Sequence, residues 1–284
     1  MTNDSWTTLV QAAALADALG RDDLVVVDCR ASLGDPGAGE RAWREGHIPG
    51  AVHADLERDL SDMRREGEGR HPWPSAGAFT ARLAAWGISP ETQVVAYDAA
   101  DGAFAARLWF LLRALGHARV AVLDGGLARW QALGLPVDDK VPQPVPASYT
   151  GEFDRSRLLD ADQVQARLDA GDVLLDARGA PRFRGEVEPI DRVAGHVPGA
   201  RNRPYPDNLV DGRFKPADQL EREFRAAIGG REPGQVIAMC GSGVTACHLL
   251  LAMEHAGLPG GKLFTGSWSG WISDPGRPVA KGDP

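Results

Sequence analysis

A single cysteine near the C-terminal end of the chain stands where a nucleophile is expected. Cys240 follows the apolar run Val236–Met239 and precedes Gly241, Ser242 and Gly243, after which an apolar helical pattern begins. Small residues let successive backbone N–H groups turn toward one point, and a helix N-terminus adds partial positive charge. A thiol in such a cradle loses its proton readily, so we expect Cys240 to act as a nucleophile near neutral pH.

The other two cysteines are expected to pack in the core and not to take part in the chemistry. Cys247 lies inside an apolar helical run and Cys29 follows a buried strand, so both are expected in the core. No pair of cysteines has the C-x-x-C spacing of a metal site, and we expect no metal. A cysteine that cleaves phosphate esters needs an arginine after five intervening residues, but Ala246 stands there. The spacing therefore disfavours a phosphatase.

Histidine occurs in two copies of one short motif and once outside it. The motif Gly-His-(Ile/Val)-Pro-Gly-Ala carries His47 in its first copy and His196 in its second. Because it also occurs in the half without the nucleophile, it predicts a structural turn with a hydrogen-bonded imidazole. His71 has no counterpart in the second half and is the better candidate for the rim of the site.

Four segments recur in the same order in the two halves of the chain. Asp98 in the first half is equivalent to Cys240 in the second, so only the second half holds the nucleophile. The prolines between the halves favour an extended connector. We expect an N-terminal domain over residues 1–137, a proline-rich linker over 138–155 and a C-terminal catalytic domain over 156–284. The recurring segments are 25–30 and 173–178, 46–51 and 195–200, 94–98 and 236–240, and 123–130 and 264–271.

Short apolar runs alternate with helical patterns, which predicts an α/β fold with a mostly parallel sheet flanked by helices in each half. Open sheets of this class bind ligands beyond the carboxyl ends of their strands, and Cys240 falls there. The expected strands are Leu24–Asp28, Gln93–Tyr97, Val120–Leu123, Val173–Asp176, Val236–Met239 and Lys262–Phe264, and the expected helices are Ala76–Trp86, Ala103–Leu115, Ala161–Ala170, Ala217–Ile228 and Val244–His255.

Composition excludes several classes of function. The chain has 284 residues, 39 acidic and 31 basic, with a net charge of -8 and no basic stripe, so nucleic acid is not an expected partner. No apolar run approaches the length of a membrane span, and residues 1–20 predict an amphipathic helix and not a signal peptide. Three cysteines do not make a disulfide framework, which favours a reducing cytoplasm.

Taken together, these motifs resemble the two-domain rhodanese superfamily of sulfurtransferases over almost the whole chain. The resemblance rests on both Gly-His-(Ile/Val)-Pro-Gly-Ala segments, the run 123–126, the loop 240–246 and the run 266–268. It implies two similar α/β domains of which only the C-terminal one is catalytically active. This agrees with the sequence, because Asp98 occupies the position in the first half that is equivalent to Cys240 in the second. Members that use mercaptopyruvate carry Gly-Ser after the cysteine, as Gly241 and Ser242 do here, whereas members that use thiosulfate commonly carry Arg-Lys.

The resemblance also implies roles for individual residues. Cys240 would accept the sulfur, Ser242 would be its hydroxyl partner, and Arg182 would bind the carboxylate of the donor. The family's second carboxylate-binding arginine follows a Glu-Pro pair, but here Ile190 follows that pair and Arg192 is the candidate replacement. The remaining candidates are the backbone groups of Gly241, Gly243, Val244 and Thr245, His71 at the rim, and Glu57, which matches a loop acid that supports the serine in the family.

The implied reaction moves a sulfane sulfur in two steps through a persulfide on Cys240. The donor is a small anion, 3-mercaptopyruvate or alternatively thiosulfate. The acceptor is a small reduced thiol, a thioredoxin-like protein or cyanide, and neither a cofactor nor a membrane is required. A non-catalytic persulfide carrier is the other alternative.

Overall fold

The structure is a computed structural model that describes residues 5–283, and it divides into two compact units. The first unit contains the chain up to Ser61 together with Pro74–Asp154. The second contains Asp62–Trp73 together with the chain from Arg155 onward. The segment Asp62–Trp73 therefore lies in the first half of the sequence but packs with the second unit.

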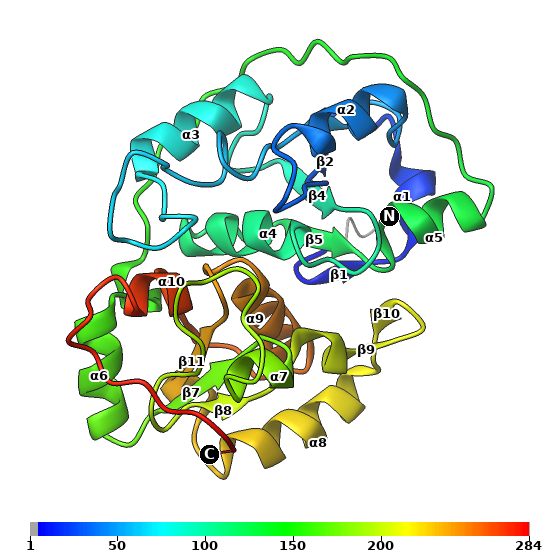
Figure 1. Cartoon of the computed structure of the whole chain (residues 1–284). Helices are drawn as coiled ribbons and strands as arrows, with labels where there is room; N and C mark the ends of the chain where they lie inside the picture. Colours follow the sequence, from blue (N-terminus) through cyan, green and yellow to red (C-terminus); the bar gives the residue numbers. More distant parts are fainter. Residues whose placement is uncertain (1–4, 284) are drawn as a thin grey trace. The chain divides into compact units, whose positions relative to one another are not determined.

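The first unit is built on a five-stranded sheet in which every pairing is parallel (Figure 1). Its strand order is β1-β5-β4-β2-β3, so the longest strands occupy the middle of the sheet. The strands are β1 (Leu9–Val10), β2 (Leu24–Asp28), β3 (Val52–His53), β4 (Gln93–Tyr97) and β5 (Val120–Leu123), and the helices are α1 (Ala12–Ala18), α2 (Ala38–Glu45), α3 (Ala76–Ala85), α4 (Ala105–Ala114) and α5 (Gly126–Ala132).

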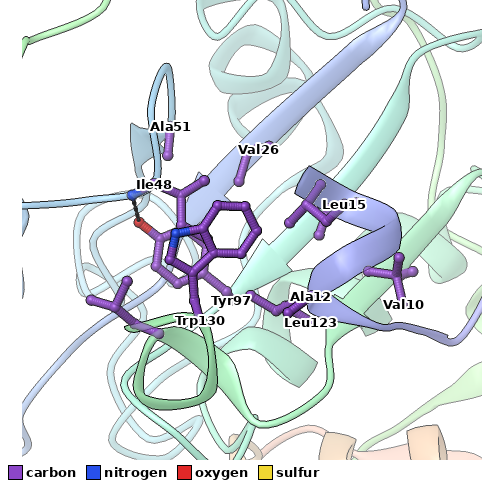
Figure 2. Close-up of a cluster of buried hydrophobic side chains, with 12 residues drawn as sticks. Val10, Ala12, Leu15, Val26, Ile48, Ala51, Tyr97, Leu123 and Trp130 are labelled. Atoms are coloured by element: carbon purple, nitrogen blue, oxygen red, sulfur yellow. Dashed lines mark hydrogen bonds between the residues drawn. The ribbon is translucent and has the colours of Figure 1, made fainter. Parts of the chain in front are cut away.

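The core of the first unit gathers around Trp130 and Tyr97 (Figure 2). Apolar side chains of α1, such as Leu15, pack there with residues of the sheet and of α5. The Tyr97 hydroxyl accepts the backbone N–H of Ile48 at 3.2 Å and donates to Asp28 at 2.6 Å. The buried polar groups of this core thus have partners, as burial requires.

The second unit repeats this plan with a parallel sheet in the order β6-β12-β11-β7-β8. A small antiparallel hairpin of β9 (Leu209–Val210) and β10 (Arg213–Phe214) is inserted in the sequence between two strands of this sheet, β8 and β11. The sheet strands are β6 (Leu158–Leu159), β7 (Val173–Asp176), β8 (Arg201–Asn202), β11 (Val236–Met239) and β12 (Lys262–Phe264), the helices are α6 (Ala161–Asp169), α7 (Ala180–Phe183), α8 (Ala217–Ile228), α9 (Thr245–His255) and α10 (Ser267–Trp271), and the 3-10 turns are η1 (Arg155–Arg157), η2 (Tyr205–Asn208) and η3 (Pro233–Gln235).

The repeated Asp-x-Arg and Gly-His motifs fasten the same turn in each unit. Arg178 pairs with Asp176 at 2.7 Å and donates to the carbonyl of Gly195 at 2.8 Å. In the first unit Arg30 pairs with Asp28 at 2.7 Å and donates in the same way to the Gly46 carbonyl. Asp28, Asp176 and Arg178 are buried and Arg30 is partly buried, and their pairing and hydrogen bonds offset the cost of removing these charges from water.

The predicted elements agree with the structure, with one correction. All six predicted strands are present with the predicted bounds, and the five predicted helices are present to within two residues at their ends. The helix predicted over residues 1–20 is wrong in extent: residues 1–4 lie outside the described part, β1 pairs with β5, and only Ala12–Ala18 is helical. Within the described residues, no helix is long and apolar enough to cross a membrane.

Candidate functional site

Cys240 lies where the central strand of the second sheet ends. β11 is paired with β7 on one side and with β12 on the other, and the loop after it leads directly into α9. Cys240 is 2% exposed, yet it is not a member of the apolar cluster that contains its neighbour Met239. The placement agrees with the predicted strand, loop and helix N-terminus.

Three hydrogen bonds from the start of α10 fix the loop that follows β11. The N–H of Trp268 donates to the Cys240 carbonyl at 3.0 Å, and the N–H of Ser269 donates to the Gly241 carbonyl at 2.9 Å. The N–H of Cys240 donates to the Ser267 hydroxyl at 3.1 Å. These bonds fix the backbone of the loop at Cys240 and Gly241.

The four backbone amides around this turn have no acceptor in the described part of the chain. They belong to Gly241, Ser242, Val244 and Thr245. Gly243 has a φ of 79°, a left-handed conformation that glycine adopts without steric cost. The loop therefore offers a nest of donors beside Cys240, which is suited to a negatively charged group.

The equivalent loop of the first unit shows what such a turn binds. Asp98 occupies the position of Cys240, and its carboxyl oxygens accept N–H groups of Ala100, Gly102, Phe104 and Ala105 at 2.9–3.2 Å. The same pair of bonds fastens the loop, since the N–H groups of residues 127 and 128 donate to the carbonyls of residues 98 and 99 at 2.9 Å. In the first unit a carboxyl group of the chain itself occupies the nest, and burial raises the pKa of this Asp98 carboxyl although the backbone N–H groups oppose the shift.

Two arginines border the loop at Gly241. A Cβ atom added to Gly241 would lie 2.8 Å from Nη2 of Arg70 and 3.7 Å from both terminal nitrogens of Arg182. Arg182, on α7, is the predicted donor-binding residue, and the structure brings it to the loop. Arg70 was not among the predicted residues, although it precedes His71, which was.

Two carboxylates hold these arginines. Arg182 donates to Glu188 at 2.7 Å and to Asp191 at 3.1 Å, and Arg70 forms an ion pair with Asp191. Burial opposes ionisation of Glu188, but hydrogen bonds from Arg182 and from backbone N–H groups outweigh it and lower its pKa. Burial raises the pKa of Asp191, and the neighbouring Glu188 adds to this effect, while Arg70 and Arg182 oppose it.

The Ser242 hydroxyl of this loop contacts the imidazole of His71. Oγ of Ser242 is 2.8 Å from Nδ1 of His71, and both side chains are buried. The segment Asp62–Trp73, which belongs to the second unit, carries His71 to this position. The two predicted residues are therefore in hydrogen-bond contact, a geometry in which a proton can pass between them.

The remaining candidates lie elsewhere or belong to the other unit. Arg192 donates its guanidinium to the backbone carbonyls of Ile272 and Ser273, after α10. Glu57 belongs to the first unit, and its proposed role stays a prediction. Cys29 and Cys247 are buried as predicted.

The repeated histidines have the predicted structural partners. Nδ1 of His47 lies 2.7 Å from the Trp43 carbonyl, and Nδ1 of His196 lies 2.8 Å from the Phe183 carbonyl. In the described part of the chain no group of three or more His, Cys, Asp or Glu side chains could hold a metal ion. A cavity of about 500 Å³, lined among others by Asp160 and Thr265, contains no residue of the Cys240 loop.

The arrangement can perform nucleophilic chemistry on a small anion. Cys240 supplies the nucleophile, the loop amides can stabilise charge on a sulfur atom, and the arginines can orient an anionic group. Stabilisation of developing charge by fixed donors commonly lowers the barrier of such reactions more than any other single effect.

Comparison with known proteins places the chain in a family. A model of the rhodanese-like domain matches residues 11–133 and again residues 160–274. A Pseudomonas aeruginosa protein named "Probable 3-mercaptopyruvate sulfurtransferase" is 52% identical over 283 residues, covering 98% of this chain and 100% of the relative. A Mycobacterium tuberculosis relative, SseB, provisionally named a thiosulfate sulfurtransferase, is 40% identical over 280 residues, covering 96% of this chain and 97% of its own.

The solved structures agree. SseA of Escherichia coli, described as a 3-mercaptopyruvate sulfotransferase with the rhodanese fold, superposes with a TM-score of 0.81 at 32% identity, covering 93% of this chain and 100% of SseA. The predicted family and the predicted fold of two rhodanese-like domains are confirmed, and the predicted sulfurtransferase class agrees with the names of these relatives. The chain belongs to the rhodanese-like family, and two rhodanese-like domains make up most of its length.

Proposed function

We propose that this chain is a sulfurtransferase that takes sulfur from 3-mercaptopyruvate and passes it to a thiol or to cyanide. The observation that carries the proposal is the loop after β11, where Cys240 stands beside four backbone amides that have no acceptor among residues 5–283. The equivalent nest in the first unit already binds the Asp98 carboxyl group. Only the second unit can therefore hold a sulfur anion there.

The first step transfers the sulfur of the donor to the enzyme. The Cys240 thiolate attacks the donor sulfur, an S–S bond forms, and the C–S bond of mercaptopyruvate breaks. The electron pair of that bond leaves with the organic product as the enolate of pyruvate, which then takes up a proton. Arg182 orients the donor carboxylate, and correct placement of the reacting atoms accounts for much of the rate.

The loop amides and Ser242 act on the charge that develops during this step. The amides after Cys240 stabilise charge on the sulfur, and loss of one donor of this kind costs roughly 3 kcal/mol. The Ser242 hydroxyl, which belongs to the same loop as Cys240 and is hydrogen-bonded to His71, supplies a proton or a hydrogen bond to the leaving enolate.

The second step returns the enzyme to its starting state. An acceptor thiolate attacks the outer sulfur of the Cys240 persulfide, forms a new persulfide and releases the Cys240 thiolate. Cyanide in place of the thiol yields thiocyanate. A small reduced thiol or a thioredoxin-like protein in a reducing cytoplasm fits this step.

Thiosulfate is the alternative donor. Arginines beside Gly241 can also bind its sulfonate oxygens, and the relative SseB carries the corresponding name. The Gly241-Ser242 pair after the cysteine favours mercaptopyruvate, and the Ser242–His71 contact can supply the proton that the enolate needs to become pyruvate, whereas sulfite leaves as a stable anion.

The test is to measure initial rates with mercaptopyruvate and with thiosulfate on the same preparation, for the natural protein, Cys240→Ser and Cys29→Ala. We expect the higher kcat/KM with mercaptopyruvate, no transfer by Cys240→Ser with either donor, and undiminished transfer by Cys29→Ala, whose thiol belongs to the first unit. Substantial turnover by a folded Cys240→Ser variant would overturn the assignment of the nucleophile. A persulfide that forms on Cys240 but never reaches an acceptor would favour the carrier.

A further inference from the structure

Two guanidinium groups from distant segments converge on the residue that follows the nucleophile. The position of a Cβ at Gly241 lies 2.8 Å from Nη2 of Arg70 and 3.7 Å from Nη1 and Nη2 of Arg182. Arg182 comes from α7, whereas Arg70 comes from the segment Asp62–Trp73 of the same unit. A side chain at Gly241 would occupy the small volume that the two cations border.

Arg70 is held so that one terminal nitrogen of its guanidinium stays available to a ligand. Its Nη1 pairs with Asp191, which is 5% exposed, and its backbone N–H donates to the Ser269 hydroxyl at 3.0 Å. Within residues 5–283, Nη2 of Arg70 and Nη1 of Arg182 have no hydrogen-bond partner. Both of these free donors belong to the groups that approach Gly241.

Asp191 connects the two arginines. One of its oxygens pairs with Arg70, and the other accepts from Nη2 of Arg182 at 3.1 Å. A carboxylate that binds one nitrogen of each guanidinium fixes the spacing between the two groups. This leaves the remaining nitrogens in place for a second carboxylate on the opposite side.

The arginine expected after the Glu-Pro pair is absent from this chain. Ile190 occupies that position and is 46% exposed, and the guanidinium of Arg192 is bound to carbonyls after α10. We propose that Arg70 is the second donor-binding cation of this site, in place of the missing arginine, and that Asp191 is the residue that positions it. The proposal rests on the proposed function.

The chemistry of the donor explains why two cations are needed. Mercaptopyruvate presents a carboxylate next to a keto group, and the negative charge on the keto oxygen grows as the enolate forms. Arg182 and Arg70 can share these oxygens while the sulfur points to Cys240. The two guanidinium groups are suited to the oxygens of an α-keto carboxylate, which is the chemical class of ligand that this site would take.

The test compares Arg70→Ala with Arg64→Ala, a matched loss of one cation from the same segment. Arg64 is 82% exposed at its side chain, and among the described residues it pairs only with Asp62. We expect Arg70→Ala to raise the KM for mercaptopyruvate about ten- to hundredfold, the range for a lost hydrogen bond to a charged group. Arg64→Ala should stay within about twofold of the natural protein.

A half-reaction measurement separates donor binding from a general effect on the fold. Each variant is loaded with saturating mercaptopyruvate, freed of donor, and mixed with a reduced thiol. The rate of persulfide loss from Cys240 should be the same for Arg70→Ala as for the natural protein to within about twofold, because this step involves no donor carboxylate. Asp191→Asn should likewise raise the KM and leave persulfide loss unchanged.

Arg70→Lys serves where the alanine variant is unstable. An ammonium keeps the charge but cannot pair with Asp191 and reach the donor in the same fork geometry, so its KM should fall between those of the natural protein and Arg70→Ala. A KM unchanged in both variants, or an equal slowing of persulfide loss, would overturn the assignment of Arg70. If the natural protein forms no persulfide from mercaptopyruvate, the proposed function itself fails, which is a separate outcome.

Discussion

Removal of the Ser267 hydroxyl should weaken the second unit and displace the nucleophile. Ser267 is fully buried, and its Oγ accepts the N–H of Cys240 at 3.1 Å and donates to the Phe264 carbonyl at 3.0 Å. Ser267→Ala leaves the Cys240 N–H without this acceptor, at about 1–3 kcal/mol, and loses a second bond worth about 1 kcal/mol. We therefore expect the free energy of unfolding to fall by about 2–4 kcal/mol.

Ser267→Gly is the matched control. Ser267 has a φ of 49°, and the equivalent residue of the first unit, Gly126, has a φ of 55°. A residue with a Cβ in this left-handed region costs about 1–2 kcal/mol relative to glycine. Ser267→Gly loses the same hydroxyl but relieves this strain. It should be about 1 kcal/mol more stable than Ser267→Ala, which reverses the usual order of the two residues in a helix.

Urea unfolding followed by tryptophan fluorescence measures these differences, because Trp268 and Trp271 are buried in the same unit. The initial rate with mercaptopyruvate should fall about tenfold or more in both variants, since a small misplacement of a reacting atom is costly. The reasoning is refuted if Ser267→Ala unfolds within about 0.5 kcal/mol of the natural protein, which is the range of neutral surface changes. It is also refuted if the alanine variant is more stable than the glycine variant.

Two further predictions concern a hydroxyl and a partly buried carboxylate. Ser242→Ala should lower kcat on the order of a hundredfold with persulfide loss unaffected, because the hydroxyl bound to His71 acts on the leaving enolate; an unchanged kcat would remove Ser242 from the reaction. Burial opposes ionisation of Glu223, but hydrogen bonds from Lys215, Arg203 and Gln219 outweigh it and lower its pKa from 4.5 to about 2. Since the pKa is lower in the folded state, this stability is present above pH 4.5 and is lost as the pH falls toward 2. Glu223→Gln should therefore unfold about 1–2 kcal/mol more easily at neutral pH, and a gap that stays constant down to pH 2 would contradict this.

The central strands of both sheets could be predicted because burial on both faces leaves a continuous apolar run. β4 and β11 are fully buried along their length, and their sequences have no polar residue except Gln93. The edge strands β1, β3, β6 and β8 have only two residues each, too few for any periodicity. Their pairing depends on neighbours that are distant in the sequence, as for Leu9 with Val122.

The site could be predicted as far as it lies in one stretch of chain. The Cys240 loop was identified because a strand, a small-residue loop and a helix follow one another, whereas the roles of Ser242 and Arg182 came from the resemblance to the family. Arg70 could not be placed, because nothing in its local sequence indicates that Asp62–Trp73 packs with the second unit. A signal was nonetheless present: His71, which had no counterpart in the second half, marked that segment as a site element.

Ser267 was missed for a different reason. Its repeat partner is Gly126, and a serine in place of glycine gives no sequence signal of a left-handed backbone. The hydrogen bond from the Cys240 N–H follows only from the return of α10 beneath the loop. The repeat thus predicted the position of the turn but not the hydroxyl that it carries.

The most direct test of the account is a rapid-quench experiment on the natural protein with mercaptopyruvate, followed by mass analysis of the peptide that contains Cys240. The account predicts that one additional sulfur atom appears on Cys240 at least as fast as turnover, and that it disappears when a reduced thiol is added. Turnover without sulfur on Cys240, or with the sulfur on Cys29 or Cys247, would contradict it.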